Sequence, residues 1–173
     1  DFYRTTYDGG DDNQGTVFKM NAKGEVTLVT SFNGRNGGHP NSGLIQWSDG
    51  FFYIQRLWDN MQIKASTPQW SGVNFCGTTS TGGESGHGPV FQVTSAGTLN
   101  TLVSFTGVNG HRLGTIPNSL IPGDDGNLYG TTYTGGPDDK GTIFRLLLQL
   151  WPPPGAGHSP TTGSSGIPPV ISP

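Results

Sequence analysis

Short runs in which apolar and polar residues alternate recur along this chain, and turns that contain glycine separate them. Three of these runs, "TVFK", "PVFQ" and "TIFR", directly follow Gly15, Gly88 and Gly141. Apolar segments ending in "TSFNG" or "VSFTG" follow the first two, and their β-branched residues suit a pleated, half-buried surface. The pattern predicts short β-strands joined by turns.

The predicted strands belong to an internal repeat. Three similar segments begin at Asp1, Asn74 and Asn127, and each ends in two adjacent threonines. In every copy the glycine that opens the next run lies nine residues after the second threonine. The first two copies are further apart than the last two, mainly because of an insert at 51–73. The insert is either an elaborated loop or a decayed half-repeat in which "FFYIQ" and "MQIKAS" pair as strands.

Each repeat is expected to fold into four antiparallel strands. The segment "GLIQW" or "SLIP" forms the first strand, and "SDG" or "DDG" is a strong hairpin signal before the second, "NLYGTTY". A glycine-rich loop leads to the third strand, "GTIFRL", and a further turn leads to the fourth, "EVTLVTSF" or "LNTLVSF". Four antiparallel strands in a period of about 40–50 residues are typical of a propeller blade.

The predicted fold class is all-β, with three four-stranded blade-like repeats in an incomplete β-propeller ring or an open array. Repeats are expected at 1–50, at 51–126 with the insert, and, in part, at 127–146. The first repeat is expected to lack its first strand and the third its last. Residues 147–173 are expected to form an apolar connector and an extended tail rich in Pro, Gly, Ser and Thr. Because propellers have at least about four blades, three units leave sheet edges that can pair with another chain.

The strings "GLIQWSDGFFY", "YGTT" with its "TGG", and "GTVFK" resemble the GloVer-type tandem repeat of secreted bacterial proteins, over residues 1–146. That resemblance implies export, cell-surface anchoring and propeller-like arrays, and it brings no enzymatic activity with it. This chain departs from the pattern at Arg4, which replaces the Gly of "YGTT", and at Cys76, which replaces its Tyr. After Arg145, "LLLQLW" stands in place of the turn.

Composition narrows the classes of partner. The 29 Gly and 13 Pro disfavour a helical fold. Nine basic and twelve acidic residues, without a Lys/Arg run that could neutralise several phosphates, argue against nucleic acid as a partner. The most apolar run, 144–151, is too short to span a membrane. A start at Asp1 without an apolar leader is expected of a processed mature protein or a fragment, which favours an extracellular or cell-surface location.

The sequence offers no constellation for catalysis, so the chain is predicted not to be an enzyme and to need no cofactor. The lone cysteine, Cys76, occupies the position of Tyr3 and Tyr129 in the other copies and is predicted to be a small buried strand residue. A reactive or intermolecular thiol is the alternative. Four histidines lie in loops or the tail without the spacing of metal ligands: His39, His87, His111 and His158.

Two acidic loops, 8–15 and 135–141, place paired aspartates beside Asn or backbone carbonyls, the oxygen ligands that Ca²⁺ prefers. The candidate ligands are Asp8, Asp11, Asp12, Asp138 and Asp139. The equivalent loop "GGESGHG" lacks the acidic pair, and Asp and Asn are ordinary turn formers. A plain solvated hairpin loop is therefore the favoured interpretation.

Two groups of residues are candidates for contact with sugars. Flat aromatic rings can stack on sugar faces, and the candidates in or beside the insert are Trp47, Trp58 and Trp70. Their alternative role is to cover the core or a subunit contact. The tail has the composition of O-glycosylated stalks, with candidate sites at Ser159, Thr161, Thr162, Ser164 and Ser165.

The leading functional hypothesis is a secreted structural protein that binds copies of itself and forms an extracellular filament or surface array. Strand addition or docking of the tail on a neighbouring subunit would connect the copies. The candidate interface residues are Leu147, Leu148, Leu150, Trp151, Ile167, Val170 and Ile171. The alternative hypothesis is a carbohydrate-binding β-propeller module, a lectin-like adhesin, whose loops and insert recognise a glycan.

Overall fold

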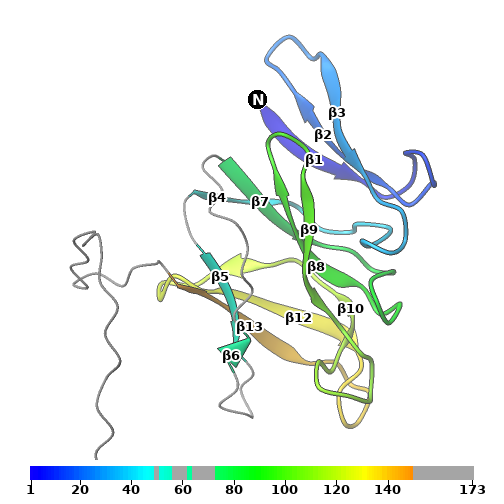
Figure 1. Ribbon diagram of the computed structural model, residues 1–173, viewed down its shortest axis with the longest axis vertical. Coiled ribbons are helices and arrows are strands. Elements are labelled where there is room, and N and C mark those ends of the chain that lie inside the picture. The colour runs from blue at the N-terminus through cyan, green and yellow to red at the C-terminus, as the bar shows by residue number, and fades with distance from the viewer. Residues whose placement is uncertain (49–50, 56–61, 64–72, 150–173) are drawn as a thin grey trace, which may run out of the picture.

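Three antiparallel β-sheets make up the described part of the chain, as a computed structural model of residues 1–48, 51–55, 62–63 and 73–149 shows. No helix is found among these residues, which confirms the all-β prediction. The sheets follow one another from the top to the bottom of Figure 1, in the order in which their central strands occur in the sequence. They do not close into a ring.

The first sheet contains three strands in the order β1-β2-β3. These are β1 (Phe2–Thr6), β2 (Thr16–Met20) and β3 (Val26–Ser31). Phe2 lies opposite Met20, which in turn lies opposite Val26. One apolar row therefore crosses all three strands on a single face of the sheet.

The second sheet contains four strands in the order β4-β7-β8-β9. They are β4 (Ile45–Ser48), β7 (Val73–Thr78), β8 (Pro89–Thr94) and β9 (Leu99–Ser104). This is the strand order that the sequence predicts for a complete repeat. The strand β4 lies before the expected boundary at residue 50, yet it pairs with β7 of the following segment.

The third sheet combines strands from two distant parts of the chain. Its path is β10-β12-β13-β5-β6, and β11 also pairs with β12. The strands are β10 (Thr115–Pro117), β11 (Ile121–Pro122), β12 (Leu128–Thr134), β13 (Ile143–Gln149), β5 (Phe51–Gln55) and β6 (Gln62–Ile63).

The insert completes the third sheet. The strand β5 pairs with β13, the place that β3 and β9 take beside β2 and β8 in the other sheets. Within the insert, Ile54 lies opposite Ile63, so the described part supports the strand-pair interpretation. The third repeat was expected to lack its last strand. The strand β5, which lies between β4 and β7 of the second sheet in sequence, occupies that position instead (Figure 1).

The constant nine-residue spacing after the paired threonines has a structural cause. The amides of Gly15, Gly88 and Gly141 donate to the carbonyl oxygens of Gly9, Gly82 and Gly135 at 2.9, 3.1 and 2.9 Å, so the three loops close alike. All three closing glycines have positive φ, of 96°, 83° and 85°. Because a side chain strains this backbone conformation, the repeat keeps glycine here.

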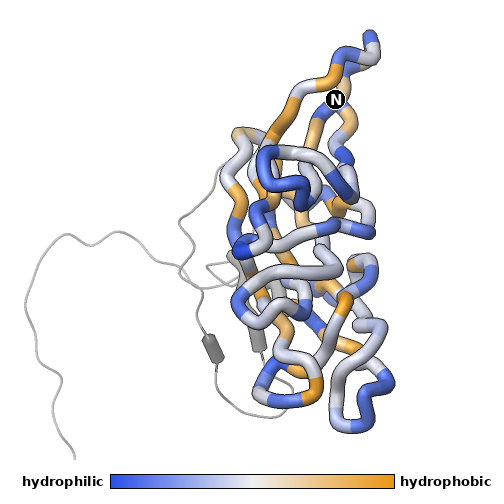
Figure 2. The backbone as a smooth tube through the Cα atoms, turned by 90° about the vertical axis from the view of Figure 1, so that its right-hand side faces the viewer, coloured by the Kyte–Doolittle hydropathy of each residue, from blue (hydrophilic) through white to orange (hydrophobic). Residues whose placement is uncertain are grey.

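Two hydrophobic cores lie between the three sheets, one at each junction. One contains Val17 and Phe32 from the first repeat with Phe75, Phe91 and Val93 from the second. The other joins the second repeat to the third, and its buried residues are Cys76, Val90, Val103, Phe105, Leu120, Leu128 and Leu146. Figure 2 shows hydrophobic stretches running through the stack, while hydrophilic stretches gather in the loops.

The two cores repeat the same aromatic contact. Phe32 meets Phe91 edge-on at 4.9 Å between ring centroids, and Phe105 meets Phe144 at the same distance. In each pair the first ring directly follows the last strand of one sheet, and the second ring lies in the third strand of the next repeat, β8 or β13. Neighbouring sheets therefore use one packing geometry twice.

Candidate functional site

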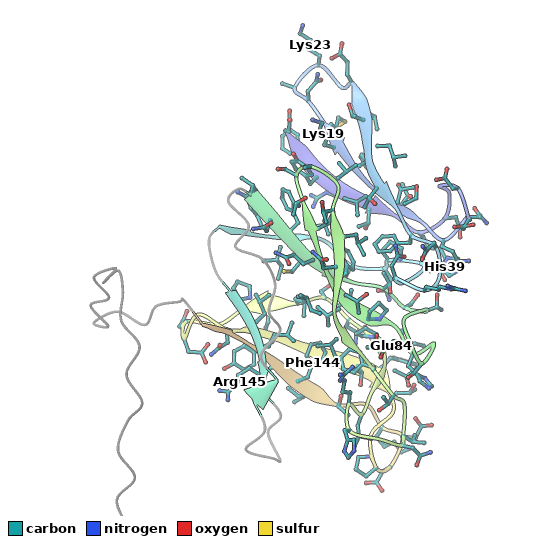
Figure 3. All side chains as sticks on the ribbon, viewed as in Figure 1. Lys19, Lys23, His39, Glu84, Phe144 and Arg145 are labelled. Carbon is teal, nitrogen blue, oxygen red and sulfur yellow. The ribbon has the colours of Figure 1, made fainter. Side chains whose placement is uncertain are left out.

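The loops that follow β1, β7 and β12 lie along the same edge of the stack, at the right of Figure 3, where His39 and Glu84 are labelled. At the same position, each loop has a residue in the left-handed region: Asn13 at φ 54°, Gly86 at φ 75° and Asp139 at φ 52°. Their amides donate to the carbonyl oxygens of Gly10, Gly83 and Gly136. The two acidic loops therefore form the same kind of turn as the loop "GGESGHG", which lacks the acidic pair.

Side-chain oxygens close two of these loops. Asp139 Oδ1 accepts a hydrogen bond from the Gly135 amide at 2.7 Å, and Asn13 Oδ1 accepts one from the Gly9 amide at 3.0 Å. Asp and Asn suit the position because they tolerate positive φ and bond to nearby backbone. The carboxylate of Asp139, a candidate Ca²⁺ ligand, is therefore part of the loop's own hydrogen bonding.

The other candidate Ca²⁺ ligands are dispersed along the loops. Asp8 Oδ1 lies 3.3 Å from His39 Nδ1, while Asp11, Asp12 and Asp138 are exposed. Among the residues that the structure describes, no group of three or more His, Cys, Asp or Glu is placed to hold a metal ion.

Two substitutions test whether the Asp139 side chain stabilises its loop by accepting a hydrogen bond. Asp139→Ala is expected to lower the free energy of unfolding by about 1 kcal/mol, because it removes the bond to Gly135 and places alanine at positive φ. Asp139→Asn should stay within about 0.5 kcal/mol of the parent, because Asn13 already fills the equivalent role. Urea denaturation of the three chains measures the difference, and equal losses in both variants would contradict the proposed role.

Two histidines join the loops of neighbouring sheets. The His39 amide donates to the Gln14 carbonyl oxygen at 2.7 Å, and the His39 ring stacks on Tyr7 with 4.7 Å between centroids. At the next junction His87 Nδ1 lies 3.1 Å from Thr115 Oγ1, and the His87 carbonyl oxygen accepts from the Ile116 amide. These contacts assign His39 and His87 to packing between successive repeats.

The lone cysteine is a buried strand residue, as predicted. Cys76 lies in β7 with no exposed surface and packs in the core between the second and third sheets. Burial raises the pKa of its thiol to about 12. The thiolate that would react with a partner is therefore scarce in the folded chain at neutral pH.

The raised pKa of Cys76 predicts a loss of stability at alkaline pH. Above pH 9 the thiol ionises in the unfolded chain but stays protonated in the folded one until about pH 12. Unfolding is therefore favoured by about 1.4 kcal/mol for each pH unit in this window. The difference between the parent and Cys76→Val in denaturant titrations at pH 8 to 11 isolates this contribution. A difference independent of pH would contradict it.

An exposed turn before β12 holds a strongly acidic carboxyl. Asp125 Oδ2 accepts hydrogen bonds from Tyr129 Oη at 2.6 Å and from Asn127 Nδ2 at 2.7 Å. The Tyr129 hydroxyl and then the Asn127 amide hold the pKa of Asp125 at about 2. These bonds fix the "DDG" turn that the sequence predicts and give Asp125 a structural role.

Several predicted site residues lie partly or wholly outside the described residues. The backbone of Trp47 in β4 pairs with Asn74, and the backbones of Leu147 and Leu148 in β13 pair with Tyr53 and Phe52 of the same chain. Strand addition by another copy at this edge of β13 would have to displace β5. The predicted residues outside the description are Trp58, Trp70, Leu150, Trp151, Ser159, Thr161, Thr162, Ser164, Ser165, Ile167, Val170 and Ile171.

The sequence interpretation missed two apolar outer faces. On the third sheet, at the lower end of the stack, Ile143 and Tyr133 are 78% and 71% exposed. On the first sheet, at the upper end, Phe2 and Val26 are 62% and 63% exposed. The repeat could have indicated the face at Ile143. Ile143 follows Gly141 by the same spacing by which the buried residues Val17 and Val90 follow their glycines.

No protein-family model matches this chain, and neither a curated protein nor a solved structure matches it. None of the residues that the structure describes forms a helix able to cross a membrane.

Proposed function

We propose that this chain is a structural protein whose β repeats self-assemble into an extracellular filament or surface array. One observation carries the proposal: the stack ends on both sides in a sheet face with large exposed apolar side chains. Phe2, Val26 and Leu28 are exposed at one end, and Ile121, Tyr133 and Ile143 at the other. Exposed apolar side chains gathered on one face of a sheet mark interaction sites, because removing them from water is favourable.

The proposed architecture is that of blade-like repeats in an incomplete propeller ring or an open array. The four-stranded sheet β4-β7-β8-β9 would be a complete blade, and the first sheet would lack its first strand. The third would take β5 as its last strand. Repeats that cannot close on their own depend on a neighbour to cover their ends.

The resemblance to the GloVer-type repeat supports an extracellular or cell-surface location, and it is the basis for proposing secretion. The chemistry of the described residues is consistent with a structural role, since their polar side chains close loops and join neighbouring sheets. Thr6 and Thr16 share a hydrogen bond at 2.8 Å, and the equivalent pair Thr132 and Thr142 share one at 2.9 Å. No catalytic step is assigned to them.

The test is the size of the full chain in solution. Size-exclusion chromatography with light scattering over a wide concentration range, together with electron microscopy, should show polymers whose length grows with concentration. A monodisperse particle near 18.3 kDa at every concentration would refute the proposal.

A carbohydrate-binding module remains the second candidate, because an exposed aromatic ring at the loop edge could stack on a sugar. Tyr7 is half exposed there and stacks on His39. Binding of the monodisperse chain to a glycan array, lost in Tyr7→Ala and kept in Tyr133→Ala, would favour this function over assembly.

A further inference from the structure

Equivalent positions on the three sheets differ sharply in exposure. Val17, Val90 and Ile143 occupy the same place in successive repeats, two residues after the loop-closing glycine. Each lies opposite an equivalent threonine on the neighbouring strand, namely Thr5 on β1, Thr78 on β7 and Thr131 on β12. Val17 and Val90 have no exposed surface, whereas Ile143 is 78% exposed. We call the face that carries these residues the front face of each sheet.

The opposite face of each sheet carries an apolar row, which we call the rear face. In the first sheet the row is Phe2, Met20 and Val26, and in the second it is Phe75, Val93 and Leu99. Phe75 and Val93 are buried, whereas Phe2 and Val26 are more than half exposed. The third sheet begins the same row with Leu128 opposite Leu146, and both are buried.

Inside the chain, the front face of one sheet packs on the rear face of the next. Val17 shares a core with Phe75 and Val93. Val90 shares the other core with Leu128 and Leu146. The same interface therefore occurs twice, and the two outer faces of the stack carry its two unpaired halves.

Polar contacts accompany each internal interface. The Thr5 hydroxyl donates to the Ser42 carbonyl oxygen at 3.2 Å, and the Thr78 hydroxyl donates to the Asn118 carbonyl oxygen at 3.1 Å. Ser42 lies just before β4 of the second sheet, and Asn118 lies between β10 and β11 of the third. On the third sheet the equivalent residue, Thr131, is exposed on the front face beside Ile143.

We propose that the front face of the third sheet binds the rear face of the first sheet of a second copy, so that Ile143 packs against Phe2, Met20 and Val26. This contact rests on the proposed assembly and identifies its partner and its surfaces. The argument for a second copy is that its rear face has the register of the rows that already cover Val17 and Val90. Each copy supplies one front and one rear face, so the contact is heterologous and can repeat without limit.

Two substitutions at opposite ends of the stack test the contact. Ile143→Asp blocks the front face and Phe2→Asp the rear face. Both side chains are exposed in the single chain, so circular dichroism and melting temperature should change little. Each variant alone is expected to assemble at least 100-fold more weakly than the parent. A control, Val108→Asp, replaces an apolar residue that is 45% exposed in a loop, and it should assemble like the parent.

Mixing the two blocked variants tests whether the contact is heterologous. The Ile143→Asp chain keeps its rear face and the Phe2→Asp chain keeps its front face. An equimolar mixture should therefore form one contact and stop as a dimer of two 18.3 kDa chains. A mixture that stays monomeric would overturn the proposal.

The remaining outcomes separate this contact from the proposed function. Polymers that persist in Ile143→Asp but vanish when residues 150–173 are deleted would overturn the face-to-face contact in favour of the tail, with assembly intact. Parent chains that form a closed ring of two copies, and not filaments, would confirm the contact while refuting the filament. A parent that is monomeric at every concentration would refute both.

Discussion

Replacing Phe91 with alanine is expected to lower the free energy of unfolding by about 3–5 kcal/mol, a large part of the stability of a domain of this size. The Phe91 ring is fully buried between the first two sheets and meets Phe32 edge-on. It also covers Gly77 on the neighbouring strand, where a Cβ would lie 2.7 Å from Phe91 Cζ. Removing the ring leaves a cavity in contact with both sheets.

The repeat offers a matched control for this prediction. Phe18 occupies the equivalent position in the first sheet but is only half-buried, because no sheet of the described residues covers that face. Phe18→Ala should therefore cost about 1–2 kcal/mol in a dilute, unassembled sample. Urea denaturation followed by tryptophan fluorescence measures both values. Equal losses would mean that the core between the sheets contributes less than its burial indicates.

Gly88→Ala is expected to cost about 3 kcal/mol. Alanine at the φ of 83° is strained, and its Cβ would collide with the Thr79 carbonyl oxygen and approach Pro117 Cδ to 2.8 Å. Pro117 belongs to β10 of the third sheet, so the collision would force the second and third sheets apart. The same substitution would disturb the loop hydrogen bond to Gly82.

Gly24→Ala isolates the two causes of this loss. Gly24 has nearly the same φ, 82°, but nothing lies within 4 Å of a Cβ built there. Its substitution should cost only about 1 kcal/mol, from backbone strain alone. Thermal melts of both variants give the comparison. A loss in Gly88→Ala no larger than in Gly24→Ala would show that the junction between the sheets yields easily.

Local sequence signals were sufficient to predict most strands. The second sheet follows the predicted order from β4 to β9, because its turns are marked by glycine and its strands by alternating residues. The pairing of β5 with β13 could not be predicted in this way. Phe52 and Leu148 are remote in sequence, and an apolar run does not specify which strand it will pair with.

The candidate site, too, could be predicted from the sequence only in part. The carboxylates of the acidic loops suggested cation binding, but an aspartate that closes a loop cannot be distinguished from a ligand by residue type alone. Comparing the three loops resolves the case of Asp139, since Asn13 and Gly86 share its backbone conformation. The outer faces were missed because the spacing around Ile143 specifies an apolar strand position but not whether another sheet covers it.

The origin of β5 has a consequence for how the chain folds. This strand is synthesised between β4 and β7 of the second sheet, but its partner β13 is the last strand of the described chain. Until β13 emerges, the edge of β5 opposite β6 has no partner, and closing the pair must bring together segments separated by the strands β7 to β12. Formation of the third sheet is therefore expected to be the slow step of folding, and a nascent chain that ends before Ile143 exposes an edge prone to aggregation.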